Sequence, residues 1–276
     1  MSNSSFTYTG RHLDHISFPL GGIGTGSIGL SGAGRLIDWE IFNRPAKGVG
    51  NGFSHFAIKA ERDGAVLDTR VLNGPFSGDL TGDYRAEWSR GFGAGARRDS
   101  LAGVPHFEDA SFEGRFPVAT LTLRDHHFPG EVSIEAFNPF IPLNDRDSSL
   151  PVAMFAFTIR NTSDKPIEYT LAGVIGHGAT QPTAATPFGE SGISGVEVAT
   201  TKLGEDNPGT RSSFWPPTPK RQAARPTCSV AYGSTRCRSI GTISPSLAAS
   251  GSAPACRTTM RVACRAIVIT ACRPHI

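Results

Sequence analysis

Residues 16–45 read ISFPLGGIGTGSIGLSGAGRLIDWEIFNRP, and this stretch decides the fold. Its first half crowds seven glycines into residues 21–34, and its second half alternates between apolar and polar residues. Alternation with a period of two predicts a β-strand with two distinct faces over residues 35–42. One face would carry Ile37, Trp39 and Ile41, and the other Leu36, Asp38, Glu40 and Phe42.

The glycine-rich half predicts a strand or turn whose backbone lies close to another segment, because glycine has no side chain to keep a neighbour away. Residues 31–34, SGAG, would form the hairpin loop that leads into the strand. We interpret eight residues of the stretch as a structural or interdomain motif. They are Gly22, Gly24, Gly26, Asp38, Trp39, Glu40, Asn43 and Arg44.

Residues 24–29, GTGSIG, match the G-x-G-x-x-G pattern of dinucleotide-binding proteins. That pattern carries meaning only between a buried strand and a helix, with an acidic residue about 20 positions later. Here Pro19 precedes it and further glycines follow, so no helix can begin where a phosphate would bind. We therefore expect no nucleotide and no other cofactor.

Asp38 and Glu40 would lie on one strand face with their Cα atoms about 7 Å apart. Retaining glycosidases hold two carboxyl groups about 5–5.5 Å apart, so a catalytic pair is conceivable. A polar strand face or an interdomain contact is the favoured interpretation, and we expect no catalytic residue in this chain.

Two other segments contain residue types that bind metals. Asp125, His126 and His127 are adjacent, and their side chains are expected to diverge from a turn beside residues 128–130, with no third ligand indicated. Residues 144–149, NDRDSS, offer oxygen ligands for calcium but lack the order of an EF-hand, so they are expected to form a loop. The sequence thus predicts no metal site.

The rest of the first 206 residues reads as strands separated by Gly/Pro turns. Residues 53–61 and 65–72 flank Asp63-Gly64, a strong hairpin signal. Residues 73–114 predict long loops with short strands, including a solvated loop tip at residues 97–99. Further strands are expected at residues 117–124, 132–137, 152–161 and 167–175. This pattern predicts an all-β fold, an antiparallel β-sandwich, for residues 1–206.

Residues 207–276 have a different composition. They hold ten of the 27 Lys and Arg residues and all five cysteines, but none of the 24 Asp and Glu residues. A basic, acid-free segment could bind nucleic acid, yet it lacks interleaved aromatic residues and zinc-finger spacing. We favour a disordered tail translated out of frame, and we expect no nucleic-acid partner.

The first residues, MSNSSFTYTGR, lack the basic and apolar regions of a signal peptide, and no apolar run approaches the roughly 18 residues of a membrane helix. We therefore expect a cytoplasmic protein without a membrane span.

Residues 13–206 resemble the N-terminal domain of glycoside hydrolase family 116, which includes non-lysosomal glucosylceramidases and bacterial β-glucosidases. The resemblance rests on PLGGIGTGSIG from Pro19, DWEIFNRP from Asp38, EAFNPFIPL from Glu135, and the run from Ser148 to Asn161. It implies an N-terminal β-sandwich followed by an (α/α)6 barrel that carries the Glu nucleophile and the Asp acid/base of a retaining β-glycosidase. No position in this chain matches those catalytic motifs.

The resemblance implies that this chain is inactive alone, that its partner is an absent (α/α)6 catalytic domain, and that only the full-length enzyme takes a β-glucoside or glucosylceramide. A stand-alone carbohydrate-binding module is the alternative, and a nucleic-acid-binding protein that uses the basic tail is a third hypothesis. Loss of the partner domain should also leave an apolar patch exposed on the sandwich.

Overall fold

The computed structural model describes residues 6–41, 45–51, 53–75 and 100–176, together with the backbone of five later strands (183–190, 193–200, 211–214, 230–238 and 261–270). Phe42, Asn43 and Arg44 lie outside the described residues, as does the predicted loop tip at residues 97–99.

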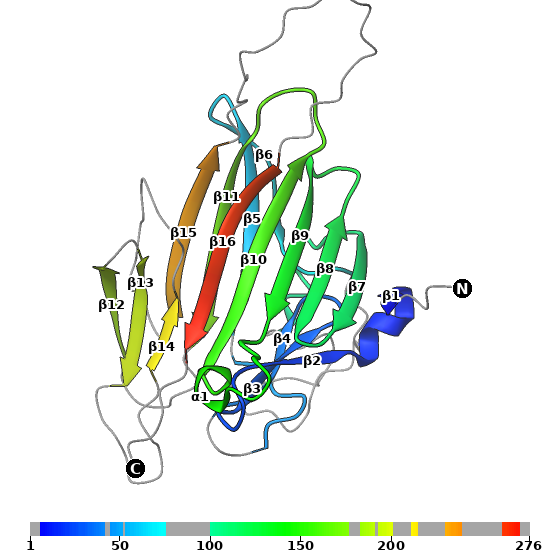
Figure 1. Ribbon diagram of the computed structural model, residues 1–276. Coiled ribbons are helices and arrows are strands. Elements are labelled where there is room, and N and C mark those ends of the chain that lie inside the picture. Colours follow the sequence, from blue (N-terminus) through cyan, green and yellow to red (C-terminus); the bar gives the residue numbers. More distant parts are fainter. Residues whose placement is uncertain are drawn as a thin grey trace, which may run out of the picture.

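The described strands form three antiparallel sheets (Figure 1). The largest has nine strands, which in spatial order are β1 (Thr7–Thr9), β7 (Asp109–Arg115), β8 (Val118–Arg124), β9 (Gly130–Phe137), β10 (Val152–Asn161), β16 (Arg261–Thr270), β14 (Arg211–Phe214), β13 (Ile193–Thr200) and β12 (Thr183–Glu190). The second has the order β15 (Val230–Arg238), β11 (Glu168–Gly176), β5 (His55–Arg62) and β6 (Ala65–Val71). The third consists of β2 (Ser17–Leu20), β3 (Ser27–Ser31) and β4 (Leu36–Glu40).

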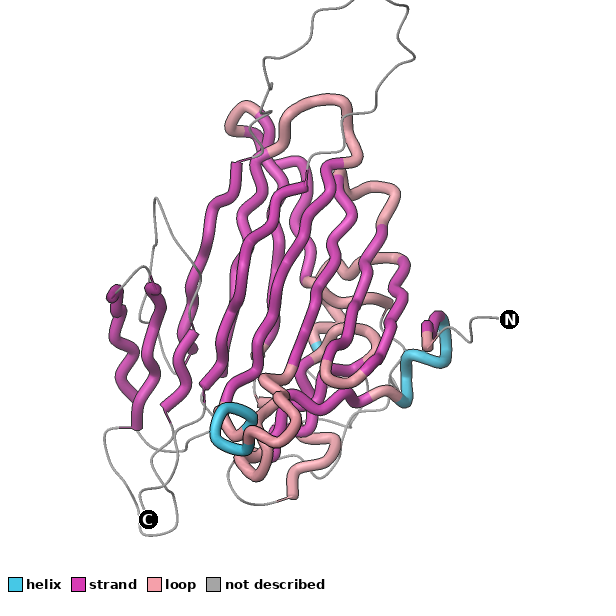
Figure 2. Tube along the Cα trace, in the orientation of Figure 1, coloured by secondary structure: helices cyan, strands magenta, loops and turns pink. Residues whose placement is uncertain are grey.

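Helical structure among the described residues is limited to the 3-10 helix η1 (Gly10–His15) and the single-turn helix α1 (Asp145–Ser148), as Figure 2 shows. None of the helices in the described part of the chain is long and apolar enough to cross a membrane.

The two larger sheets pack face to face over an aromatic core. Phe56 of β5 lies between two side chains of β10, with ring centroids 5.1 Å from Phe155 and 5.0 Å from Phe157, both in edge-on geometry. All three side chains are at most 5% exposed. Edge-to-face rings add to the stabilisation from buried area, so this contact holds the layers together. The predicted all-β, antiparallel fold is confirmed.

Local signals located several strands correctly. Asp63 and Gly64 both have positive φ values (51° and 81°), as a two-residue hairpin turn between β5 and β6 requires. Strand β10 has the predicted bounds. The weakly patterned region 73–114 nevertheless contains the seven-residue strand β7, which pairs with β8 along its whole length. Only Ala110 and Phe112 are buried in β7, and this short apolar signal explains why it was not resolved from sequence.

The predicted alternation of residues 35–42 is wrong beyond Ile37. Leu36, Asp38 and Trp39 are all buried, so two consecutive residues face the interior. The register between β3 and β4 shifts at this point, and Asp38 adopts a left-handed conformation with φ of 51°. A β-bulge places two residues opposite one and re-aims their side chains, which accounts for the loss of the simple period.

Three segments of the region 207–276, namely β14, β15 and β16, have strand backbone that pairs with the sheets. The remaining residues of this region lie outside the described part of the chain. The out-of-frame origin of the tail, its disorder and its boundary at residue 206 therefore stay predictions.

Candidate functional site

The sequence blocks that carry the family resemblance meet at one end of the sandwich. The three-stranded sheet and the loop containing α1 lie together there (Figure 1). Asn138, which is 7% exposed, joins them: its Oδ1 accepts from the Gly21 N–H at 2.7 Å, and its Nδ2 donates to the Pro19 carbonyl at 2.8 Å. One side chain thus satisfies both a donor and an acceptor of a segment nearly 120 positions away.

Backbone contact continues along the same seam. The Ile23 N–H donates to the Ser148 carbonyl at 2.9 Å. A Cβ atom on Gly22 would collide with the backbone of Leu150 and lie 2.7 Å from the carbonyl carbon of Ser149. The predicted close backbone approach is therefore confirmed, and at Gly22 the neighbour is residues 149–150 of this same chain.

The other two glycines of the predicted motif have different roles. Gly26 has a φ of 85°, and a Cβ there would collide with the Glu40 carbonyl and lie 3.0 Å from Cα of Ile41, so this glycine lets β4 approach. Gly24 has a φ of 71° with open space around a would-be Cβ, so its requirement is conformational.

The bulge turns the carboxylate of Asp38 into a hydrogen-bonded position. Its Oδ2 accepts from Ser17 Oγ and its Oδ1 from the Gly48 N–H, both at 2.6 Å, and Lys47 Nζ lies 3.7 Å away. Burial alone would raise the pKa of Asp38, but the Ser17 and Gly48 hydrogen bonds and the charge of Lys47 together hold it below its ordinary value.

Glu40 is bound to the same lysine. Its Oε2 lies 2.9 Å from Lys47 Nζ, and its Oε1 accepts from the Ala46 N–H at 3.2 Å. The hydrogen bond from Lys47, followed by that from Ala46, lowers the pKa of Glu40. The pair Asp38 and Glu40 therefore shares one cation, and both carboxyl groups favour their ionised form.

This electrostatic state does not suit glycoside hydrolysis. A glycosidase needs one carboxyl group whose pKa is raised, so that it carries a proton to the leaving group. Both pKa shifts here run in the opposite direction. The arrangement supports the interpretation of Asp38 and Glu40 as a structural clamp on residues 46–48.

Trp39 completes that clamp. It is 2% exposed. Its indole Nε1–H donates to the Leu36 carbonyl at 3.1 Å, and its backbone N–H donates to the Val49 carbonyl at 3.4 Å. Trp39 thus belongs to the core and holds the loop after β4. Asn43 and Arg44 of the same predicted motif are outside the described residues.

Exposed apolar side chains gather on the loops at this end. We call Ile23, Ile141, Leu143 and Leu150 the apolar end surface; each is at least 45% exposed. Leu143 is fully exposed and has a left-handed backbone with φ of 64°. A bulky residue in this conformation is unusual in an isolated loop, so the surface is a candidate contact with another domain.

The loop itself is well ordered by hydrogen bonds. Ser148 Oγ both accepts from the Ile141 N–H at 2.9 Å and donates to the Ile141 carbonyl at 3.0 Å. Asn144 caps α1 by accepting from the Asp147 N–H at 3.1 Å. Residues 144–149, predicted to be a loop, therefore include one helical turn whose polar groups bond to one another.

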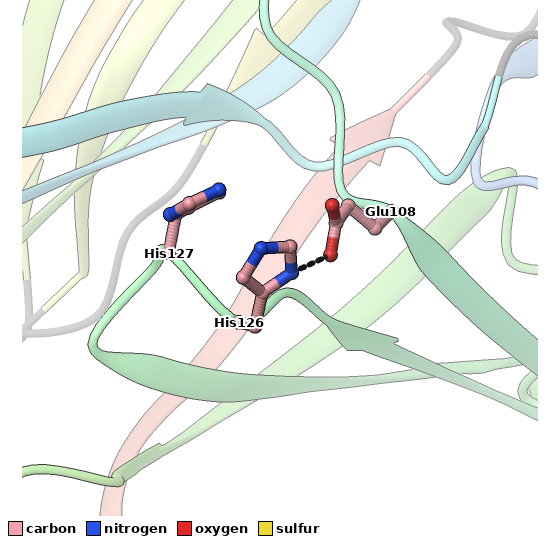
Figure 3. Close-up of side chains that lie close together, drawn as sticks. All are labelled: Glu108, His126 and His127. Carbon is pink, nitrogen blue, oxygen red and sulfur yellow. Dashed lines mark hydrogen bonds and ion pairs between the residues drawn. The ribbon is translucent and has the colours of Figure 1, made fainter.

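The turn predicted after β8 is confirmed, because Asp125 Oδ1 accepts from the N–H groups of His127 (2.8 Å) and Phe128 (3.3 Å). The predicted divergence of the two histidines is wrong: their ring centroids lie 3.8 Å apart. Glu108, which sequence reasoning missed, approaches the same pair from the segment before β7 (Figure 3). Glu108 is not close to the two histidines in the sequence, so only knowledge of the pairing between β7 and β8 could have placed it beside them.

We predict that Asn138→Ala lowers the free energy of unfolding by roughly 1–3 kcal/mol, because the N–H of Gly21 and the carbonyl of Pro19 both lose their partner. Asn138→Asp should also destabilise the protein at neutral pH: it keeps the acceptor for Gly21, but it places a charged oxygen against the Pro19 carbonyl at a buried position. Urea denaturation of the three proteins at neutral pH measures the series. Equal stability of Asn138→Ala and wild type would contradict the role of Asn138.

We also predict that Asp38 makes stability pH-dependent. Because the folded-state pKa lies below the unfolded value of about 3.8, the stabilisation is full above that pH and is lost as the pH falls through the folded-state value. The stability difference between wild type and Asp38→Asn should therefore be constant from pH 7 to about 5 and shrink in stronger acid. A difference that grows on acidification would refute it; urea midpoints across this range provide the measurement.

Comparison with known proteins supplies the family. No curated protein matches this chain. A family model described as beta-glucosidase 2, glycosyl-hydrolase family 116 N-term, matches residues 17–209, which is more than half of the chain. The matched residues include the glycine-rich hairpin, the Asp38–Lys47 clamp and the Asn138 loop. The chain therefore belongs to the family of glycosyl-hydrolase family 116 N-terminal domains.

Proposed function

We propose that this chain is the supporting β-sandwich of a β-glucosidase or glucosylceramidase of family 116, and that it hydrolyses no substrate alone. The observation that carries the proposal is the family match over residues 17–209. The reacting carboxyl groups would come from an (α/α)6 catalytic domain outside the residues printed here, and that domain would cleave β-glucosides with retention of configuration.

The ionised, paired carboxylates of Asp38 and Glu40 support the proposal that the sandwich has no hydrolytic activity alone. Both carboxylates are held by Lys47 and by backbone N–H groups, and neither has the raised pKa of an acid catalyst. Their role in the proposal is to fix the loop at residues 46–49 beside the glycine-rich hairpin.

The apolar end surface supports a docked partner. Its four side chains project from segments that the Asn138 and Ser148 hydrogen bonds hold in place, so the surface is formed before a partner arrives. Burial of apolar area of this kind is worth about 25 cal/mol per Å², which favours association with the catalytic domain.

The composition of residues 207–276 supports the further proposal that they are translated out of frame. The family match ends at residue 209, close to the position where acidic residues cease. An out-of-frame segment would explain why a sandwich of this family continues into a basic, cysteine-bearing sequence.

The function is tested by assay of the purified chain with an aryl β-glucoside. We expect no turnover above buffer, because both clamp carboxylates are held in their ionised form by Lys47 and by backbone N–H groups. Hydrolysis that Asp38→Asn or Glu40→Gln abolishes would refute the proposal. Addition of a separately produced catalytic domain should give activity or a stable complex, whereas saturable glycan binding by the chain alone would favour a carbohydrate-binding module.

The proposed contact between the apolar end surface and the catalytic domain is tested with a matched pair of variants. Leu143→Asp should weaken capture of the catalytic domain, whereas Val66→Asp, at an exposed apolar residue of β6 away from this surface, should not. Equal capture by both variants would show that the apolar end surface is not the contact.

The reading frame is tested by the nucleotide sequence. We expect one of the two alternative frames downstream of the Asp206 codon to remain open and to encode a sequence with ordinary acidic content. Stop codons in both alternative frames just past this point would refute the proposal for residues 207–276.

A further inference from the structure

The end of the sandwich opposite α1 carries a cluster of three metal-ligating side chains. Glu108 lies just before β7, and His126 and His127 lie in the turn between β8 and β9 (Figure 3). One ligand atom from each residue lies within 4.8 Å of the others, and all three residues are exposed. Among the described residues this is the only group of three or more His, Cys, Asp or Glu side chains that meets this separation.

The backbone that holds these ligands is fixed by buried groups. The side chain of Asp125 is fully buried; besides its bonds to His127 and Phe128 it accepts from the Glu108 N–H at 3.2 Å and pairs with Arg70 Nη1 at 3.0 Å. The carboxylate of Asp125 therefore ties the segment of Glu108 to the turn that carries both histidines.

Two aromatic side chains anchor the cluster from below. Phe107 precedes Glu108, Phe128 follows His127, and their rings pack edge to face with centroids 5.2 Å apart while both are at most 2% exposed. The backbone on either side of the cluster is thus held in place next to Glu108 and next to His127. A site whose backbone is already in place loses less entropy when it binds an ion.

The chemistry of the cluster matches a borderline divalent cation. His126 Nδ1 contacts Glu108 Oε2, and in Figure 3 the His126 ring lies between Glu108 and His127. Two imidazole nitrogens and one carboxylate oxygen form a donor set that suits Zn²⁺ and leaves positions for water. An open cavity of about 420 Å³, lined by Glu108 and His126 among others, gives room for those waters.

We propose that Glu108, His126 and His127 bind one Zn²⁺ ion. The ion would take the place of the direct contact between His126 and Glu108, and each imidazole would bind it through an unprotonated ring nitrogen. The positive side chains nearby are engaged with carboxylates: Arg70 pairs with Asp125, and Arg124 and Arg160 share Glu131. The site is distinct from the apolar end surface, because it lies at the other end of the strands.

The test is calorimetric titration of the full chain with ZnCl₂. Its five cysteines, all beyond residue 227, are first alkylated so that thiols do not bind the ion. Wild type should bind one equivalent, and Glu108→Gln, His126→Gln and His127→Gln should each weaken the affinity by about tenfold or more. His12→Gln, at an exposed histidine of η1, is the matched control and should bind as wild type does.

Thermal unfolding provides a second readout, because an ion that binds only the folded chain raises the melting temperature. At one fixed zinc concentration the rise should be as large for His12→Gln as for wild type and clearly smaller for each of the three cluster variants, each compared with the same protein without zinc. Absence of a zinc equivalent in wild type, or equal affinity in the control and the cluster variants, would overturn the proposal.

Discussion

Close contact between two backbones is the constraint on which this end of the molecule depends. Gly22 lies against the backbone of residues 149–150, at a distance that leaves no room for a side chain. Asn138 then pairs with both the carbonyl of Pro19 and the N–H of Gly21. The close approach at Gly22 and the two hydrogen bonds of Asn138 therefore hold the same pair of segments together.

The same constraint explains the departure of β4 from a regular strand. Gly26 allows the Glu40 carbonyl to approach β3, and the bulge at Asp38 turns that carboxylate toward Ser17 and the N–H of Gly48. Asp38 and Glu40, which the sequence suggests are two acids on one strand face, therefore hold the loop at residues 46–48 in place. The lowered pKa values follow from that fastening, since hydrogen bonds to a carboxylate stabilise its charged form.

The β-sandwich could be predicted from sequence because several strands show an alternation of apolar and polar residues within their own length. Residues 152–161 alternate over ten positions, and Asp63-Gly64 encodes its turn in two residues. The bulge could not be predicted in this way, since it depends on a neighbour at Gly26. The partnership of Asn138 with Gly21, and that of Glu108 with His126, depend on pairing across the sheets, which no local period contains.

The two ends of the sandwich differ in what their loops present to solvent. The β8–β9 end is polar, and its charges are largely paired or clustered around the histidines. The α1 end places Leu143 in solvent on a left-handed backbone, a conformation that costs of order 1–3 kcal/mol for a non-glycine residue. Nothing among the described contacts of this side chain offsets that cost. In the proposed docking with a second domain, burial of the Leu143 side chain would offset part of that cost.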